Sequence, residues 1–183
     1  MINFVNTFLK KSNKIGFFVV LICGTLLHFT YQWSGENRII GLFSAVNEST
    51  WEHMKLLFFP SFVYFLVEHK KYGSTSKDLL TARTLGLLFG LAFIPVSFYT
   101  YSGIIGKNFM IIDIIIFAVS VFLTFYFSSR FLSRPQRLTS LAAFLILLLM
   151  LILFFWFTFF PPHIQLFLDP VNFTYGSAFP LFL

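Results

Sequence analysis

Long apolar runs are the dominant pattern of the 183-residue chain. Five segments of 18 to 22 residues cover about 15–32, 49–69, 83–101, 108–129 and 139–160. As helices they would span about 27–33 Å, which is enough to cross the hydrocarbon core of a bilayer. Strands of a membrane barrel would alternate in polarity, and these runs do not. The pattern therefore predicts an all-α integral membrane protein, a five-helix transmembrane bundle.

The second segment is the most polar of the five. Its purely apolar part, Leu56 to Val67, is too short to span a bilayer alone. We therefore expect one continuous helix whose first two turns are formed by the polar residues Ser49 to Lys55. Pro60 and Pro95 predict bends inside helices, because neighbouring helices can satisfy the carbonyl groups that a proline frees.

Composition excludes several classes of protein. Apolar residues make up 57% of the chain and charged residues 11%, against about 25% charged in soluble domains. A soluble enzyme and a disordered chain are therefore excluded. The net charge of +6 comes from basic residues beside apolar segments, a pattern of membrane orientation rather than of nucleic-acid binding. The single cysteine, Cys23, excludes an internal disulfide, and the basic, then apolar N-terminus without a cleavage site predicts an uncleaved first helix.

Basic residues predict the orientation of the bundle. Ten of the 13 Lys and Arg lie in the N-terminal tail and in the loops after the second and fourth segments, and three lie on the other side: Arg38, Lys55 and Lys107. Positive charge favours the cytoplasmic side. We expect a single transmembrane domain over 1–183 with a cytoplasmic N-terminus, an outer C-terminus and an apolar tail, 161–183, on the outer face.

A small-xxx-small pattern, Gly86 and Gly90, lies in the third segment. Such a pattern lets two helix backbones approach closely in lipid. It indicates either packing within one chain or contact with a second copy or another membrane protein. The lipid bilayer is the partner that the composition itself indicates.

Five of the seven acidic residues and three of the four histidines fall on the predicted outer side. We expect one outward-facing cavity there, capped in part by the tail, with these candidate binding residues: His28, Glu48, Glu52, His53, Lys55, Asp113 and Asp169. Glu52 and Asp113 would be acid/base or cation-binding carboxylates, with His53 the third catalytic candidate. Lys55 would keep a carboxylate ionised. Glu68, among lysines on the inner side, is expected at an ordinary solvated boundary.

A divalent metal such as zinc is a candidate cofactor for this cavity. Its candidate ligands are His28, Glu52, His53 and Asp113, which could supply three protein ligands and leave one position open. Neither an HExxH motif nor the Glu-x-x-His spacing of diiron sites is present. A structural interpretation competes: Ser49-x-x-Glu52 as a capping box, Trp51 as an interfacial anchor and Asp113 as a hydrogen-bonded tie between helices. A Ser49–His53 nucleophile pair has less support, since nothing indicates a third, orienting group.

Two motifs carry a resemblance. Asn47-Glu48-Ser49-x-Trp51-Glu52-His53-x-Lys55, together with the terminal Pro-Pro-x-x-x-Leu-Phe-x-Asp-Pro-x-x-x-x-Tyr-Gly, resembles a family of small bacterial membrane proteins of unknown function. The likeness extends from about His28 to Gly176. It implies a bacterial plasma membrane and about five helices, and it brings no activity.

Three classes of function remain open from the sequence. The outer polar cluster could bind or pass a small solute, an ion or a lipid headgroup. It could be the site of a metal- or acid/base-assisted hydrolase acting on a lipid-linked substrate. It could also be structural, in a partner subunit of a membrane complex.

Overall fold

The computed structural model describes residues 2–73, 78–134 and 136–177, with side chains from residue 11 onward. Its helices are α1 (Ile2–Trp33), α2 (Arg38–Gly41), α3 (Thr50–Tyr72), α4 (Leu79–Ile105), α5 (Met110–Leu132), α6 (Ser140–Phe159) and a 3₁₀ turn, η1 (Gln165–Phe167). The described ranges contain no strand, only an isolated bridge between Leu168 and Tyr175. The all-α class is therefore confirmed.

Among the described residues, four helices are long and apolar enough to cross a membrane: α1 over Lys11–Trp33, α4, α5 and α6. These helices indicate a membrane protein. The more polar α3 is not among them, and the short α2 was not expected from the sequence. Residues 178–183 of the expected tail lie outside the described residues.

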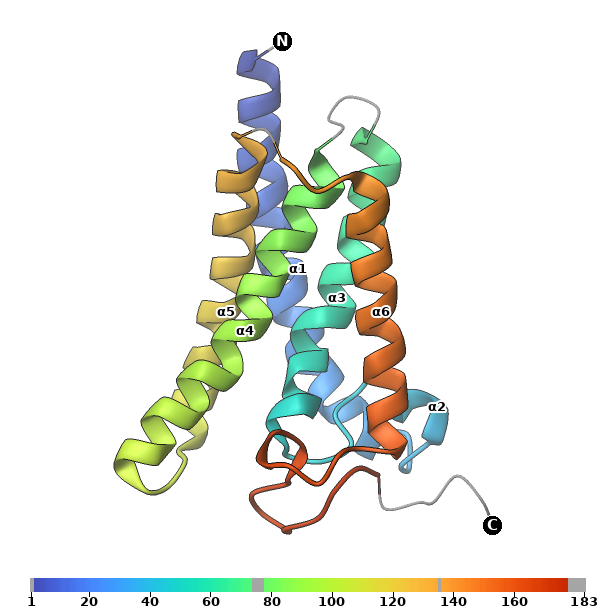
Figure 1. Cartoon of the computed structure of the whole chain (residues 1–183), viewed down its shortest axis with the longest axis vertical. Helices are drawn as coiled ribbons and strands as arrows, with labels where there is room; N and C mark the ends of the chain where they lie inside the picture. Colours follow the sequence, from blue (N-terminus) through green and yellow to red (C-terminus); the bar gives the residue numbers. More distant parts are fainter. Residues whose placement is uncertain (1, 74–77, 135, 178–183) are drawn as a thin grey trace.

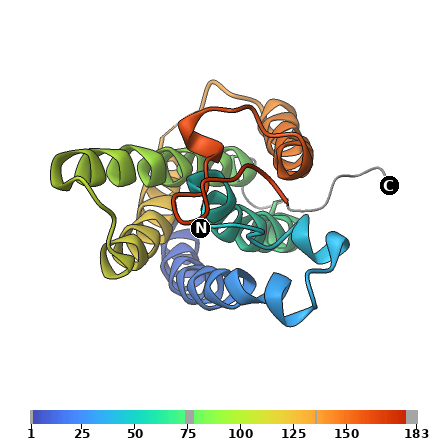
Figure 2. The ribbon, with the colours of Figure 1, turned by 90° about the horizontal axis from the view of Figure 1, so that it is seen from below.

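The long helices run side by side along the long axis of the molecule (Figure 1). The start of α1 lies at one end of the bundle, and α3 ends and α4 begins at that same end. The opposite end carries α2, the α4–α5 connection and residues 161–177, which we call the tail segment. Figure 2 shows the tail segment crossing this end of the bundle, which we call the tail end.

Helix α3 is continuous from the polar motif into the apolar core. Ser49 is its N-cap, and the Ser49 hydroxyl accepts from the Glu52 N–H at 3.4 Å. The helix then runs through Pro60 to Tyr72, as the sequence predicts. Trp51 differs from the expected interfacial anchor because it is buried, with its ring 4.9 Å from that of Phe167.

Gly86 and Gly90 lie in the interface between α4 and α5. A Cβ on Gly86 would come within 2.7 Å of the Ser128 backbone nitrogen, and one on Gly90 within 2.8 Å of the Ser120 carbonyl oxygen. The pattern therefore packs two helices of one chain, and these glycines are not available for the contact with another molecule that the sequence left open.

A buried ion pair ties α3 to α4 near the amino-terminal end. Arg83 Nε donates to Glu68 Oε2 at 2.7 Å, and Arg83 Nη2 donates to Glu68 Oε1 at 2.7 Å. The guanidinium also donates to Asn13 Oδ1 on α1 at 2.7 Å. Glu68 is 4% exposed, so the solvated boundary expected for it is wrong. In these apolar surroundings the charge partner of Glu68 is Arg83, which lies 15 positions later in the chain.

Candidate metal centre

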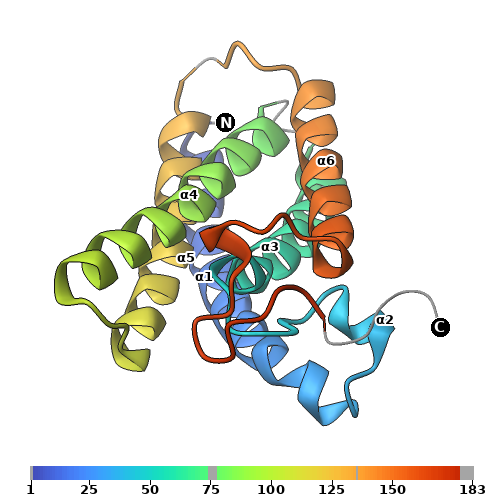
Figure 3. The ribbon, with the colours of Figure 1, turned by 60° about the horizontal axis from the view of Figure 1, so that its bottom comes forward.

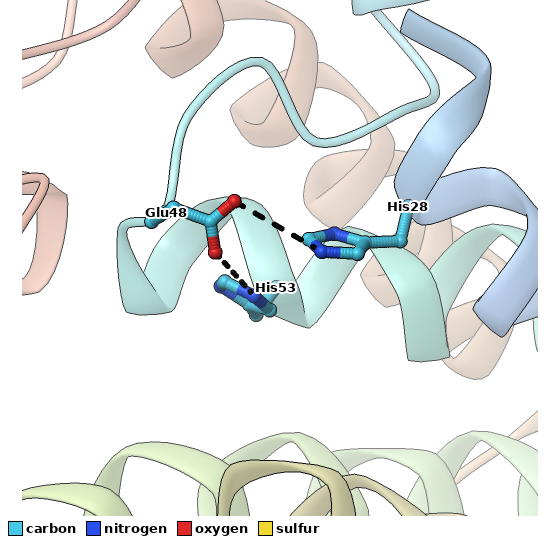
Figure 4. Close-up of side chains that lie close together, drawn as sticks. All are labelled: His28, Glu48 and His53. Carbon is cyan, nitrogen blue, oxygen red and sulfur yellow. Dashed lines mark ion pairs between the residues drawn. The ribbon is translucent and has the colours of Figure 1, made fainter. Parts of the chain in front are cut away.

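Three side chains at the tail end point toward one another (Figure 4). His28 comes from the last turns of α1, Glu48 from the loop before α3 and His53 from the first turn of α3. The distances are 3.9 Å from His28 Nε2 to Glu48 Oε1 and 3.4 Å from His53 Nε2 to Glu48 Oε2. One ligand atom of each residue lies within 4.8 Å of the others. We call these residues the His28–Glu48–His53 cluster.

The hydrogen bond made by His53 Nδ1 determines what the other ring nitrogen, Nε2, presents to Glu48. His53 Nδ1 lies 2.9 Å from the Ser49 carbonyl oxygen. A carbonyl only accepts, so Nδ1 carries the proton. In the neutral ring Nε2 then presents a lone pair to the Glu48 carboxylate. Two acceptors facing one another favour a cation between them, and a metal-ligating histidine commonly donates its second N–H to a carbonyl in this way.

Glu48 lies between the two rings, 44% exposed at its side chain. When His53 is protonated, its hydrogen bond lowers the pKa of Glu48, against the opposing effect of burial, and the charges of both histidines add a smaller lowering. The carboxylate therefore stays ionised through the ordinary titration range of glutamate. Its contribution to stability is lost only as the pH falls below that range.

The spacing of the cluster suits a small divalent ion. Zinc holds nitrogen and oxygen ligands at about 2.0–2.2 Å, which places tetrahedral ligand atoms about 3.3–3.6 Å apart. The separation of His53 Nε2 from Glu48 Oε2, 3.4 Å, falls in this range, whereas His28 Nε2 lies 3.9 Å from the other oxygen, Oε1. Ligand atoms within 4.8 Å of one another would therefore move slightly closer around a bound ion. Two imidazole nitrogens and a carboxylate oxygen are a ligand set that zinc accepts.

Glu52 and Lys55 form a separate buried pair. Their charged groups lie 2.6 Å apart, and Lys55 Nζ also donates to the carbonyls of Gly41 at 2.9 Å and Ser44 at 3.3 Å. Glu52 in turn accepts from the Val46 N–H at 3.0 Å. These contacts hold the loop between α1 and α3 against the first turns of α3. Glu52 is thus engaged with this loop and does not belong to the His28–Glu48–His53 cluster.

Asp113 is engaged elsewhere. It accepts from the Tyr101 hydroxyl, and its second oxygen lies 3.5 Å from Asn108 Nδ2. Tyr101 is on α4 and Asp113 on α5, so the carboxylate ties these two helices together near their connection. The residues expected in one cavity thus form three groups: the His28–Glu48–His53 cluster, the Glu52–Lys55 pair, and Asp113 with Tyr101.

Asp169, in the tail segment, contacts the cluster through the backbone. It is 1% exposed, and its Oδ2 lies 3.4 Å from the N–H of Glu48. Oδ1 accepts from the N–H groups of Val171 at 2.7 Å and Asn172 at 3.2 Å. Asp169 therefore folds the tail segment and meets Glu48 at the same time.

Sequence reasoning found His28, Glu48 and His53 as candidates but placed Glu52 and Asp113 with them. It missed Asn47, whose side chain donates to the Gly176 carbonyl at 3.0 Å. It also missed Tyr99, whose hydroxyl donates to the Gln165 carbonyl at 2.8 Å. Asn47 is the first residue of the motif that begins Asn47-Glu48-Ser49, whereas Tyr99 lies in neither motif.

Comparison with known proteins adds the family of the chain. No curated protein and no solved structure matches it. The model of a family of unknown function, DUF6512, matches residues 2–177. This match covers nearly all of the chain, including α1 to α6 and the tail segment. The chain therefore belongs to the DUF6512 family.

Proposed function

We propose that this protein is a multi-pass membrane protein that binds a divalent transition-metal ion, zinc in the first instance, through His28, Glu48 and His53. One observation carries the proposal. His53 Nδ1 donates to the Ser49 carbonyl, so in the neutral ring Nε2 faces the Glu48 carboxylate as a second acceptor at 3.4 Å. A metal ion satisfies both groups, and His28 supplies the third ligand.

A proton on His53 is the competing explanation of the same geometry. A protonated ring would pair with Glu48 as a simple ion pair. His28 would then make no hydrogen bond to this pair, since its Nε2 lies 3.9 Å from the carboxylate and its ring centroid lies 5.2 Å from that of His53. A metal ion can take lone pairs from both imidazoles and an oxygen from Glu48, whereas one proton on His53 pairs with Glu48 alone.

We further propose five crossings, with α3 as the fifth, a cytoplasmic N-terminus and an outer tail end, in a bacterial plasma membrane. The support is the asymmetry of Lys and Arg. The charges that would burden α3 in lipid are also paired, Glu52 with Lys55 and Glu68 with Arg83. Paired charges remove much of the cost of placing them in a membrane-spanning helix.

This topology predicts the labelling of introduced cysteines. In a background where Cys23 is replaced by alanine, Gly103→Cys near the end of α4 should react with a membrane-impermeant maleimide in intact cells. Lys70→Cys near the end of α3 should react only after the cells are opened. The reverse pattern would contradict the proposed orientation, and equal labelling of both positions in intact cells would contradict five crossings.

Binding is favoured over passage by the polar residues deeper in the bundle. The hydroxyls of Ser120, Thr124 and Ser128 donate to carbonyls of their own helix, those of Phe117, Ser120 and Thr124, at 2.6–2.9 Å. They are buried against Gly86 and Gly90. These hydroxyls therefore serve the packing of α4 on α5 rather than a path for a solute.

The metal proposal predicts zinc binding by the purified protein in detergent, measured by calorimetric titration at neutral pH. Glu48→Gln and His53→Gln should each weaken binding more than about 100-fold, beyond the about 10–100-fold typical of changes to groups that merely orient a ligand. His163→Gln is the control, because His163 is an exposed histidine of the tail end stacked on Tyr175.

Binding should weaken as the pH falls into the range in which histidines take up a proton, because zinc requires neutral imidazoles. Glu48, with its lowered pKa, stays ionised over that range. A wild-type protein that binds zinc no more tightly than the Glu48→Gln variant would contradict the proposal and leave the structural role in a membrane complex.

A metal-dependent hydrolase is the second candidate function. The side chains of the cluster are partly exposed, 28% at His28 and 32% at His53. A site of three protein ligands with partial exposure leaves a coordination position for water, as in hydrolytic zinc enzymes. A lipid-linked substrate would suit such a site in a membrane protein.

A further inference from the structure

The two sequence motifs of this chain form a single structure at the tail end. Figure 3 shows the tail segment beside the beginning of α3. Asn47 Nδ2 donates to the Gly176 carbonyl at 3.0 Å, and the Glu48 N–H faces Asp169 Oδ2 at 3.4 Å. Thr50 donates to the Tyr99 hydroxyl at 3.2 Å, which itself donates to the Gln165 carbonyl. Glu48 and the residues next to it are therefore fastened to the tail segment at several points.

Asp169 is the member of the tail segment that meets a proposed ligand directly. Its two carboxylate oxygens have different tasks. Oδ1 accepts from the backbone of Val171 and Asn172, which closes the turn, whereas Oδ2 accepts from the Asn172 side chain at 3.2 Å and faces the Glu48 N–H. The Asp169 N–H and carbonyl also bond Thr174 and Phe173, both at 2.9 Å. Hydrogen bonds within the turn thus hold Asp169 where its Oδ2 faces Glu48.

We propose that Asp169 is a positioning residue of the metal site, which fixes the backbone of Glu48 so that its carboxylate stays between His28 and His53. This proposal rests on the proposed metal binding. Glu48 needs such support because it precedes α3 and lies in the loop that follows α2. Its carboxylate lies between the two rings, 3.9 Å from His28 Nε2 and 3.4 Å from His53 Nε2.

A consequence of this arrangement is reciprocal coupling between the metal and the tail segment. If docking of the tail segment raises the affinity for the metal, the metal must stabilise the docked tail segment by the same factor. Phe173 reports on this docking because its side chain is 75% exposed at the tip of the turn that Asp169 closes. Zinc should therefore slow cleavage by chymotrypsin after Phe173.

Asp169→Asn tests the proposal with the smallest change in shape. One oxygen remains to close the turn, but the amide that replaces Oδ2 cannot accept from the Glu48 N–H. Zinc titration in detergent should show about 10–100-fold weaker binding than wild type, the range for groups that orient metal ligands. Zinc should also lose its protective effect on cleavage after Phe173, which a purely structural role of Asp169 would leave in place.

Tyr99→Phe is the matched control. It removes the hydroxyl that fastens Gln165 and Thr50 but leaves the contact between Asp169 and Glu48, so the loss of zinc affinity should be much smaller than in Asp169→Asn. Unchanged affinity in Asp169→Asn, or an equal loss in both variants, would overturn the positioning role while leaving metal binding intact. A wild-type protein that does not bind zinc would overturn both proposals, so the two failures are distinguishable.

Discussion

Arg83→Met is expected to destabilise the protein by about 3–5 kcal/mol, the cost of leaving one member of a buried ion pair without its partner. Glu68 would lose both bonds from the guanidinium, and Asn13 would lose its donor. Three helices, α1, α3 and α4, meet at this network. Thermal unfolding of the purified variant in detergent should show a large fall in Tm.

Two controls separate the ion pair from the loss of a side chain. Arg130→Met changes an exposed arginine on α5 and should leave Tm nearly unchanged. The double variant Glu68→Leu with Arg83→Met should recover much of the loss, because apolar replacement of both partners is often neutral. A single variant as stable as wild type would show that this ion pair does not hold the three helices together.

Lys55→Met is expected to have a comparable effect, about 3–5 kcal/mol, at the tail end of the bundle. The Glu52 carboxylate would remain buried without its charge partner, and the carbonyls of Gly41 and Ser44 would lose a donor. Since these bonds hold the α1–α3 loop, its amides should exchange faster in hydrogen-exchange mass spectrometry. Glu48 lies in this loop, so its carboxylate should be held less firmly and zinc affinity should fall as well.

The matched control for Lys55 is Lys70→Met, an exposed lysine near the end of the same helix. It should leave Tm and the exchange of the loop unchanged. If Lys55→Met behaved like Lys70→Met, the loop would have to be held by contacts other than the buried pair, and the account of the tail end would be incorrect.

The sequence predicted the helical class and the continuity of α3, and both have a simple physical basis. Apolar runs of this length must form helices in lipid. The polar start of α3 is explained by local geometry as well, because Ser49 caps the helix and Glu52 and Lys55 are three positions apart on it. Interactions between near neighbours on one helix can be read from spacing.

Contacts between distant parts of the chain could not be read from spacing. Glu68 and Arg83 pair across the α3–α4 connection, and Glu48 meets Asp169 from 121 positions away. The outer side of the sequence therefore appeared as one pool of polar residues. The structure divides it because Lys55 draws Glu52 toward the α1–α3 loop, while Tyr101 draws Asp113 toward α4.

X-ray absorption at the zinc edge tests the central claim most directly. The wild-type protein, loaded with one equivalent of zinc in detergent, should show two imidazole nitrogens at about 2.0–2.1 Å and additional oxygen at about 2.0–2.2 Å. The imidazole contribution should halve in His28→Gln and remain complete in His163→Gln. A spectrum with oxygen ligands alone, or one that is unchanged in His28→Gln, would contradict metal binding by His28, Glu48 and His53.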